Sequence, residues 1–273
     1  MNKSFSLHKI TNAEQFSFDA ADYSKFKYGD NNAAAEFGTA LAKGFIKEYE
    51  NSLLAAQQLV VISSPYSFIP TATFAMKNYF VFTLNRWLAE NNLPITQETK
   101  VHRTITYKDD YGALDAAERL VLIGNDSFHI DAKFLTNKTL VFLDDIRITG
   151  SHEKMITKML GEYNLANDCY LLYFAELVNK EIHPNIENHL NYFSVKSISD
   201  LNDIVQSNNF AINTRIVKYI LHTESKMFLE FIEKQSFNFI NLLFDMAIGN
   251  GYHTIEAYSG NMEILKELIL KKH

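Results

Sequence analysis

The chain has 273 residues, of which 47% are hydrophobic and 21% are charged, and its formal net charge is −6. This length allows a full hydrophobic core and exceeds one minimal α/β domain of about 150 residues, so we expect one domain with an added subdomain. The acidic balance and the lack of a long basic run disfavour nucleic acid or anionic lipid as a partner. The single cysteine, Cys169, excludes an intrachain disulfide and fits a reducing cytosol.

The sequence shows no pattern typical of membrane targeting. Its first residues, MNKSFSLHKI, contain no apolar signal region, and no run approaches about 18 apolar residues. We therefore expect a cytoplasmic protein without a membrane partner.

Apolar strand patterns alternate with helical patterns along the first two thirds of the chain. Asp30 or Asn31 is a candidate N-cap for the first of the helices. The predicted elements are a helix over 33–49, a strand over 59–63, a helix over 71–91, strands over 100–107 and 120–123, and a strand over 169–178. This alternation favours a parallel sheet covered on both faces.

From about Ser199 the pattern becomes helical throughout. The predicted helices cover residues 201–205, 212–221, 227–232, 237–248 and 262–270. We therefore divide the chain into an α/β domain over 1–198, with its core at about 20–180, and a helical cap over 199–273. The cap either helps to recognise a ligand or simply covers a sheet edge or makes a homodimer contact.

The most informative segment is LVFLDDIRITGSHE, residues 140–153. Four apolar residues predict a buried strand, two aspartates follow, and a Thr-Gly-Ser turn opens a helix with apolar residues on one face. In an open α/β sheet, ligands bind beyond the carboxyl ends of strands, where turn amides at a helix N-terminus can hold a phosphate. Asp144 and Asp145 would then face vicinal hydroxyls or a Mg²⁺ ion. The alternative is that the aspartates merely cap a strand-to-helix turn.

This apolar strand, Asp-Asp, three residues and Thr-Gly resemble the phosphoribosyl pyrophosphate (PRPP) signature of type I phosphoribosyltransferases. The resemblance implies a parallel-sheet core of that type and transfer of ribose 5-phosphate from PRPP to a nitrogen acceptor. Members that alkylate purines often have an acidic residue just before the Thr-Gly, and that position is Ile148 here. His152 lies three residues after Thr149, at a position where the resemblance implies a residue with a hydroxyl group. It is either a phosphate contact or a solvent-facing residue of the first helical turn.

The resemblance also implies a pyrophosphate loop directly after the first core strand. Ser63-Ser64-Pro65-Tyr66-Ser67 occupies this place, and its hydroxyls and amides can bond pyrophosphate oxygens. A strained or cis peptide at Ser64-Pro65 would suit such a clamp. Without its position in the chain, the segment is typical of an ordinary turn.

A mobile flap is implied between the second and third strands of the family fold. Here that interval contains Arg103 and Lys108, which would stabilise the departing pyrophosphate and the oxocarbenium-like ribose. The alternative is a solvated charged loop.

A further patch, YSKFKYGD over residues 23–30, precedes a helix and is typical of a turn on its residues alone. Together with SSPY, KDDYG and DDIRITGSHE, it is similar to the phosphoribosyltransferase-like proteins of bacterial tellurium-resistance (Ter) gene clusters, over residues of about 20–180. Lys27 and Tyr111 thereby become candidate contacts for the acceptor or a phosphate.

The predicted site combines residues for the metal and ribose, for the leaving charge and for PRPP binding. Asp144 and Asp145 hold Mg²⁺ and the ribose, while Arg103 and Lys108 act on the leaving charge. The residues expected to bind PRPP are Ser63, Ser64, Pro65, Tyr66, Ser67, Asp144, Asp145, Ile146, Arg147, Ile148, Thr149, Gly150, Ser151 and His152. The expected partners are PRPP and an unidentified small-molecule acceptor.

Two other functions fit the same motif. A binding module that lacks a general base would sense PRPP or a nucleotide, and a nucleoside-phosphate hydrolase or phosphorylase would use the same ribose contacts. A PRPP synthetase is disfavoured because the sequence has no ATP-binding motif. No histidine spacing predicts zinc, and no glycine-rich loop predicts a nicotinamide cofactor.

Overall fold

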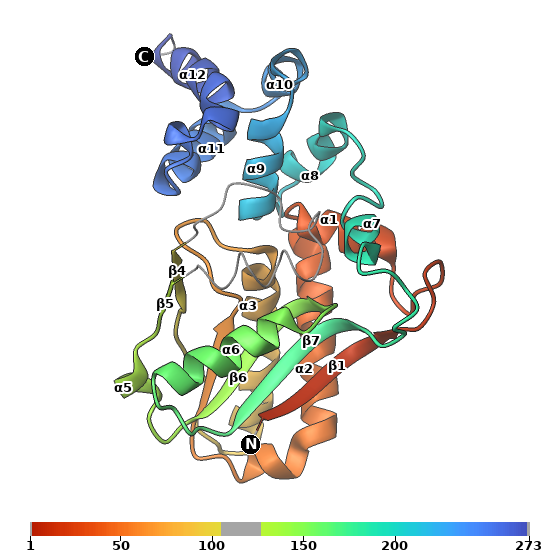
Figure 1. The fold of residues 1–273 in the computed structure, drawn as a ribbon, viewed down its shortest axis with the longest axis vertical. Helices are drawn as coiled ribbons and strands as arrows, with labels where there is room; N and C mark the ends of the chain where they lie inside the picture. The colour runs from red at the N-terminus through yellow and green to blue at the C-terminus, as the bar shows by residue number, and fades with distance from the viewer. Residues whose placement is uncertain (1, 105–126, 272–273) are drawn as a thin grey trace.

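The computed structural model describes residues 2–104 and 127–271, which contain a five-stranded parallel sheet (Figure 1). The strand order is β1-β7-β6-β2-β3, and every neighbouring pair is parallel. The strands are β1 (Asn2–Ile10), β2 (Leu59–Ser63), β3 (Gln97–Glu98), β6 (Thr139–Arg147) and β7 (Cys169–Leu177). The predicted α/β fold with a parallel sheet is confirmed.

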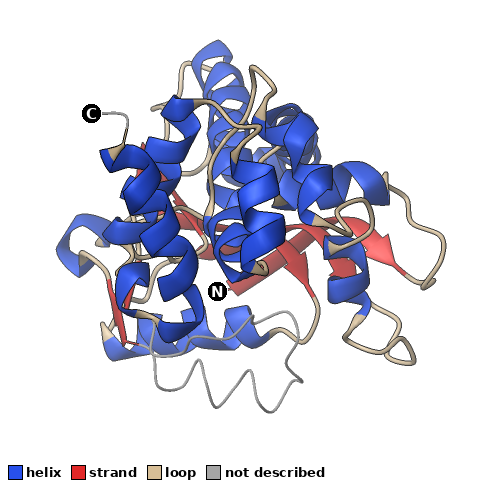
Figure 2. Cartoon of the chain, turned by 90° about the horizontal axis from the view of Figure 1, so that it is seen from above, coloured by secondary structure: helices blue, strands red, loops and turns tan. Residues whose placement is uncertain are grey.

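Helices cover both faces of this sheet (Figure 2). On one face the odd-numbered positions of β6, such as Val141 and Leu143, share a hydrophobic cluster with α2 and α3. On the other face Leu140 and Phe142 cluster with α6. Burial on both faces explains why the central strands are continuous apolar runs. The helices of this part are α1 (Ala20–Lys27), α2 (Asn31–Leu54), α3 (Ala72–Glu90), α5 (Ala132–Leu135), α6 (Ser151–Glu162) and α7 (Ile186–Asn191).

Several predicted elements appear with nearly the expected bounds. Asp30 is the N-cap of α2, because its carboxylate accepts the N–H groups of Asn32 and Ala33. Strand β2 has the predicted bounds, and β7 differs from its prediction by one residue. The apolar side of α6 is buried against the sheet, as predicted.

Three parts of the chain differ from expectation. Residues 2–10 form β1, which lengthens the sheet beside β7, although the sequence pattern had left them unassigned. The patch over 23–30 is mostly helix α1, so a simple turn there was wrong. Within the strand expected over 100–107, the described residues include β4 (His102–Thr104), which pairs antiparallel with β5 (Ser127–His129), whereas β3 pairs with β2 in the parallel sheet. The segments 105–107 and 120–123 lie outside the described residues.

The C-terminal part is helical, and it lies at one end of the sheet (Figure 1). It has its own buried apolar cluster, which includes Ile216, Phe228 and Leu243. Its elements are the 3-10 turn Ile198–Leu201, α8 (Asn202–Val205), α9 (Thr214–His222), α10 (Ser225–Ile232), α11 (Phe237–Gly249), the 3-10 turn Tyr252–Thr254 and α12 (Glu256–Leu270). We refer to residues 198–270 as the cap.

Backbone contacts fix the cap to the end of the sheet. The N–H of Ala211 donates to the carbonyl of Gly29 at 2.9 Å, and a Cβ at Gly29 would lie only 2.6 Å from the Ala211 oxygen. Gly29 also has a φ of +102°, so this close approach depends on glycine. On the other side, the Asn250 side chain accepts the N–H groups of Phe68 and Ile69. The loop after β2 is therefore held by the cap.

Within the described residues, no helix combines the length and the apolar character needed to cross a membrane.

Candidate functional site

A cavity of about 640 Å³ lies between the cap and the carboxyl end of the sheet. Its wall on the sheet side, which we call the core wall, contains most of the predicted PRPP-binding residues. These are Ser64 to Ser67 after β2, Asp144 to Arg147 at the end of β6, and Ile148 to His152 in the following turn and the start of α6. Lys27 also lines it. Ser63, the last residue of β2, does not. The fold thus brings three separate predicted segments to one cavity.

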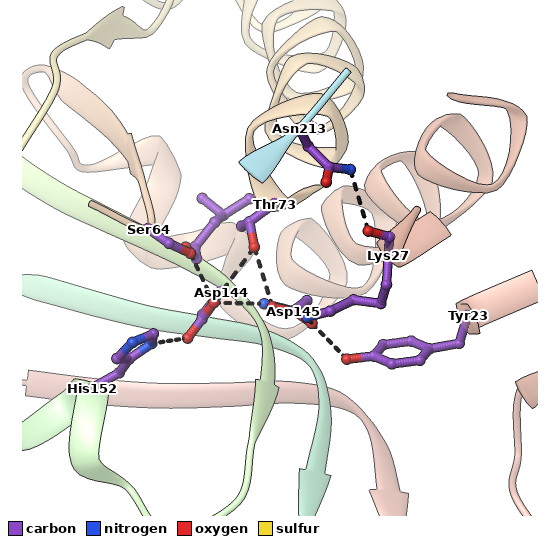
Figure 3. Close-up of polar contacts among 9 residues, drawn as sticks. Tyr23, Lys27, Ser64, Thr73, Asp144, Asp145, His152 and Asn213 are labelled. Carbon is purple, nitrogen blue, oxygen red and sulfur yellow. Dashed lines mark hydrogen bonds and ion pairs between the residues drawn. The ribbon is translucent and has the colours of Figure 1, made fainter. Parts of the chain in front are cut away.

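Asp144 and Asp145 are the last but three and last but two residues of β6, respectively, and they point to opposite faces of the sheet. Figure 3 shows their surroundings: His152 contacts Asp144, whereas Tyr23 and Lys27 approach Asp145 from the other side. The two carboxylates are adjacent in sequence but have different partners. Asp144 contacts an imidazole nitrogen and Asp145 contacts an ammonium group.

The Asp144 carboxylate is buried and accepts several hydrogen bonds. The Ser64 hydroxyl donates to it at 2.7 Å and the Asp145 N–H at 3.0 Å, while Nδ1 of His152 contacts its other oxygen. Burial alone would raise the pKa of Asp144, but the charge and hydrogen bond of His152, with the Ser64 hydroxyl and Lys27, lower it far below its usual range. Asp144 is therefore an ionised acceptor at neutral pH.

Asp145 belongs to a buried ion pair. Lys27, whose side chain is only 10% exposed, contacts the same carboxylate oxygen that accepts the Tyr23 hydroxyl. Tyr23 and Lys27 are four residues apart on α1 and so lie on one face of that helix. The Thr73 hydroxyl, from the start of α3, reaches the second oxygen of Asp145 at 3.2 Å. Helices α1 and α3 thus converge on this one side chain of β6.

The turn after β6 has the shape expected for a phosphate site. Gly150 has a φ of +72°, in the left-handed region, and it begins helix α6. The Thr149 and Ser151 hydroxyls lie 2.7 Å apart. The amides of the first turn of α6 have no intrahelical acceptor, so this end of the helix can hold an anion.

The side chain of Arg147 forms ion pairs with two carboxylates. It contacts Glu176 and lies 2.8 Å from Glu153. Burial alone would lower the pKa of Arg147, but these two acids raise it. Glu176 also contacts Lys9 and accepts the Ser6 hydroxyl, so β1 is tied into the same network. We infer that the Arg147 side chain fixes the position of the turn.

The sequence matches the family described as PRTase ComF-like over residues 1–265. The chain belongs to the PRTase ComF-like family. No curated protein matches the chain. Membership of this family agrees with the parallel sheet and with the resemblance to phosphoribosyltransferases in residues 140–153.

Several lining residues of this family member were not predicted from its sequence. Tyr173, on β7, is the partner of Asp144 in the sheet register and lines the cavity. Its hydroxyl is buried and has no hydrogen-bond partner, and burial, followed by the charges of Asp144 and Glu153, raises its pKa. Thr71, the N-cap of α3, has a buried hydroxyl with the same lack of a partner. No local motif marks either residue, because both come into the site only through the fold.

Three predicted residues receive no test from the structure. Arg103 belongs to β4, but the position of its side chain is not described. Lys108 and Tyr111 lie outside the described residues. The peptide bond before Pro65 is trans, so the cis alternative suggested for this clamp is wrong. His152 does not face only solvent, because its Nδ1 contacts Asp144.

Proposed function

We propose that this protein transfers ribose 5-phosphate from PRPP to a nitrogen acceptor and releases pyrophosphate. The observation that supports this most is the convergence at one cavity of the Thr149-Gly150 turn, the Asp144–Asp145 pair and the loop Ser64 to Ser67. A phosphate site, a pair of acceptors for ribose hydroxyls and a second anion site are the three parts that PRPP requires. Family membership supports phosphoribosyl transfer in general.

The 5-phosphate would bind the amides of Gly150 to His152. Gly150 keeps the backbone open because it has no side chain, and the nearest atom to a Cβ there would be Arg147 Nη2 at 3.5 Å. The unpartnered hydroxyl of Tyr173 supports the same assignment, since a buried O–H without an acceptor costs about 1 to 3 kcal/mol unless a ligand accepts it.

The pyrophosphate would bind between the loop Ser64 to Ser67 and the start of α3. The N-cap residue Thr71 makes no side-chain capping bond, and Ala72 and Thr73 line the cavity. This end of α3 therefore presents helix amides and the free Thr71 hydroxyl toward the space where pyrophosphate is expected.

Magnesium fits the donor set in part. Mg²⁺ commonly binds one or two carboxylates together with phosphate oxygens of a substrate, and Asp144 is an ionised carboxylate that lines the cavity. We infer that Asp144 and Asp145, directly or through water, would supply the protein side of such a site. When bound, the ion would neutralise charge on PRPP and its leaving group.

In the reaction, the bond from C1 of ribose to pyrophosphate breaks and a bond from C1 to the acceptor nitrogen forms, with a proton leaving that nitrogen. Catalysis would come mostly from positioning and from charge stabilisation. Arg103 and Lys108 remain predictions for the leaving charge. The position just before Thr149-Gly150 is Ile148, which is not acidic. An acceptor that needs a carboxylate at this position to remove its proton is therefore disfavoured.

A regulatory role is the second candidate, because Ile148 is apolar and both aspartates already have protein partners in Lys27 and His152. Such a protein would bind PRPP or a nucleotide without turnover. The association with Ter gene clusters likewise remains a prediction from sequence motifs.

Pyrophosphate release separates these two functions. We would incubate the protein with Mg²⁺ and PRPP, with and without a small-molecule extract of cells, and measure pyrophosphate. The proposed function predicts slow release with water as a poor acceptor, faster release with the extract, and loss of both in Asp144→Asn. Asp203→Asn removes an exposed carboxylate of the cap and serves as a matched control. Saturable PRPP binding by calorimetry without release in any condition would favour the regulatory role.

A further inference from the structure

The cap wall of the cavity is formed mainly by one face of helix α9. The residues of α9 that line the cavity come in adjacent pairs, and each pair is followed by the next one helical turn later. They therefore form a stripe on one side of the helix. They are Thr214, Arg215, Lys218, Tyr219, His222 and Thr223. The opposite side of α9 is fully buried in the cap through Ile216, Val217, Ile220 and Leu221. Burial of that apolar side fixes which residues face the cavity.

The N-terminus of α9 is held to the core by hydrogen bonds. Asn213, which is 3% exposed, donates to the carbonyl of Lys27 at 3.2 Å and caps α9 by accepting the Ile216 N–H. The Thr214 hydroxyl donates to the carbonyl of Ile69 at 2.8 Å. Because Lys27 contacts Asp145 and Ile69 follows the predicted pyrophosphate loop, α9 is positioned by the same segments that build the core wall.

The two walls differ in charge. On the core wall, the cations Lys27 and Arg147 are balanced by the acids Asp144 and Asp145. On the cap side, Arg215 and Lys218 of α9 line the cavity together with Lys196, which lies just before the cap, and Glu187 of α7 is the acid among the described lining residues outside the Asp144–Asp145 pair. Burial and the charge of Asp145 raise the pKa of Tyr23, and the nearby charge of Arg215 acts against them. The cap side therefore has a net positive charge and faces the site from across the cavity.

Aromatic rings accompany these cations. Tyr192, Tyr219 and Tyr258 line the cavity from three different elements. The rings of Tyr192 and Tyr219 lie 6.1 Å apart, and those of His222 and Tyr258 lie 6.3 Å apart. Tyrosine rings offer flat apolar surface with a polar edge, which suits a planar ring as ligand.

We propose that the acceptor is a planar nitrogen compound with an acidic group, a carboxylate or a phosphate, held between the PRPP site and the basic face of α9. This inference rests on the proposed function, since it names the class of its second substrate. Lys218 and Arg215 recognise the acidic group, the tyrosine rings contact the plane of the acceptor, and its nitrogen points toward the ribose on the core wall.

The test begins with PRPP alone, so that failure of the proposed function is recognised separately. Calorimetry with Mg²⁺ and PRPP is compared for the unaltered protein, Lys218→Gln and Lys234→Gln. Lys234→Gln removes an exposed lysine of the cap that does not line the cavity. We expect all three proteins to bind PRPP within about twofold of one another. Weaker PRPP binding in Lys218→Gln alone would assign the α9 cations to pyrophosphate and overturn the proposal.

The acceptor is then sought by its charge. A small-molecule extract of cells is separated on an anion exchanger, and each fraction is tested for stimulation of pyrophosphate release. We expect the stimulating activity in the retained, ultraviolet-absorbing fractions. Treatment of those fractions with phosphatase distinguishes a phosphate from a carboxylate. Activity in the unretained fractions, or no stimulation by any fraction in a protein that binds PRPP, would overturn the proposal.

The variants complete the test. In Lys218→Gln, the concentration of the active fraction that gives half-maximal release should rise at least about tenfold, the effect of one lost charged hydrogen bond. Lys234→Gln should leave it unchanged. An equal response of both variants would contradict a role of α9 in acceptor binding.

Discussion

The core wall and the cap wall of the cavity are built in different ways. The core wall comes from short continuous segments, and its charged residues Asp144, Asp145 and Arg147 are bonded within the protein. The cap wall comes from one side of α9 and from residues of other elements, such as Tyr258 of α12. A site that binds a phosphate through backbone amides needs a turn of defined conformation. A basic face needs only cationic side chains spaced so that they lie on one side of a helix. We therefore expect substitutions in the core wall to change stability and binding together, and substitutions in the cap wall to change binding alone.

The largest effect is expected from Asp145→Asn. This change leaves the ammonium of Lys27 buried without a carboxylate, which should lower the free energy of unfolding by about 3 to 5 kcal/mol. Urea denaturation measures the loss. The double variant Asp145→Asn, Lys27→Met removes both charges and should recover part of it. Unchanged stability in the single variant would mean that the pair contributes nothing to the fold.

Gly150→Val should act on the backbone of the phosphate turn. Valine at a φ of +72° is strained by about 1 to 3 kcal/mol, which should lower the free energy of unfolding. The turn amides should then no longer bind a phosphate. Denaturation and calorimetric titration with ribose 5-phosphate measure the two effects. Gly161→Ala is the matched control, since it lies in the same helix with nothing within 4 Å of its Cβ. A Gly150→Val protein that binds ribose 5-phosphate normally would remove this turn from the proposed site.

His152→Gln tests the charge that holds Asp144 ionised. Because the pKa of Asp144 is lowered in the folded protein, its stabilising contribution is present above the unfolded pKa of about 3.9 and is lost as the pH falls further. The variant should be less stable by about 1 to 2 kcal/mol at pH 7. The difference from the unaltered protein should shrink below about pH 4. Denaturation curves across this range would contradict the pairing if the difference stayed constant.

Tyr173→Phe should separate binding from stability on the core wall. The hydroxyl has no partner, so its removal should leave the free energy of unfolding within about 0.5 kcal/mol or raise it slightly. Ribose 5-phosphate binding should weaken by about 0.5 to 1.5 kcal/mol if the hydroxyl donates to the phosphate. Calorimetry with ribose 5-phosphate decides this, and equal affinity would leave the buried hydroxyl without an assigned role.

The smallest effect on stability is expected from Lys218→Gln. The side chain is only partly buried and glutamine keeps the helical propensity, so the free energy of unfolding should change by no more than about 0.5 kcal/mol. A loss comparable to that of Asp145→Asn, measured in the same urea series, would show that the cap wall is as structural as the core wall.

The prediction of the site from sequence was best where the chemistry is local. The segment from Leu140 to Glu153 holds its strand, acids, turn and helix in one stretch, and all of them appear in the structure. The loop Ser64 to Ser67 was located only through its place after β2. Lys27 was found by motif, but its pairing with Asp145 is a contact across 118 residues that no local pattern encodes.

The sequence by itself determined the alternation of strands and helices, because buried parallel strands and amphipathic helices have distinct apolar periods. It did not reveal β1, whose residues are mostly exposed or half-buried at the edge of the sheet and lack a clear pattern. Nor did it assign β3, since two residues are too few for any period.

Only the tertiary structure decided which residues share the cavity. Tyr173 joins the site because parallel pairing places it beside Asp144, and α9 presents Arg215 and Lys218 because its apolar side is buried in the cap. The positions of Tyr173 and of α9 both depend on contacts between segments distant in sequence. The free energy of these contacts comes from the burial of apolar surface and not from neighbouring residues in the chain. The phosphate turn is encoded locally by the left-handed Gly150, whereas the opposite wall exists only once the chain has folded.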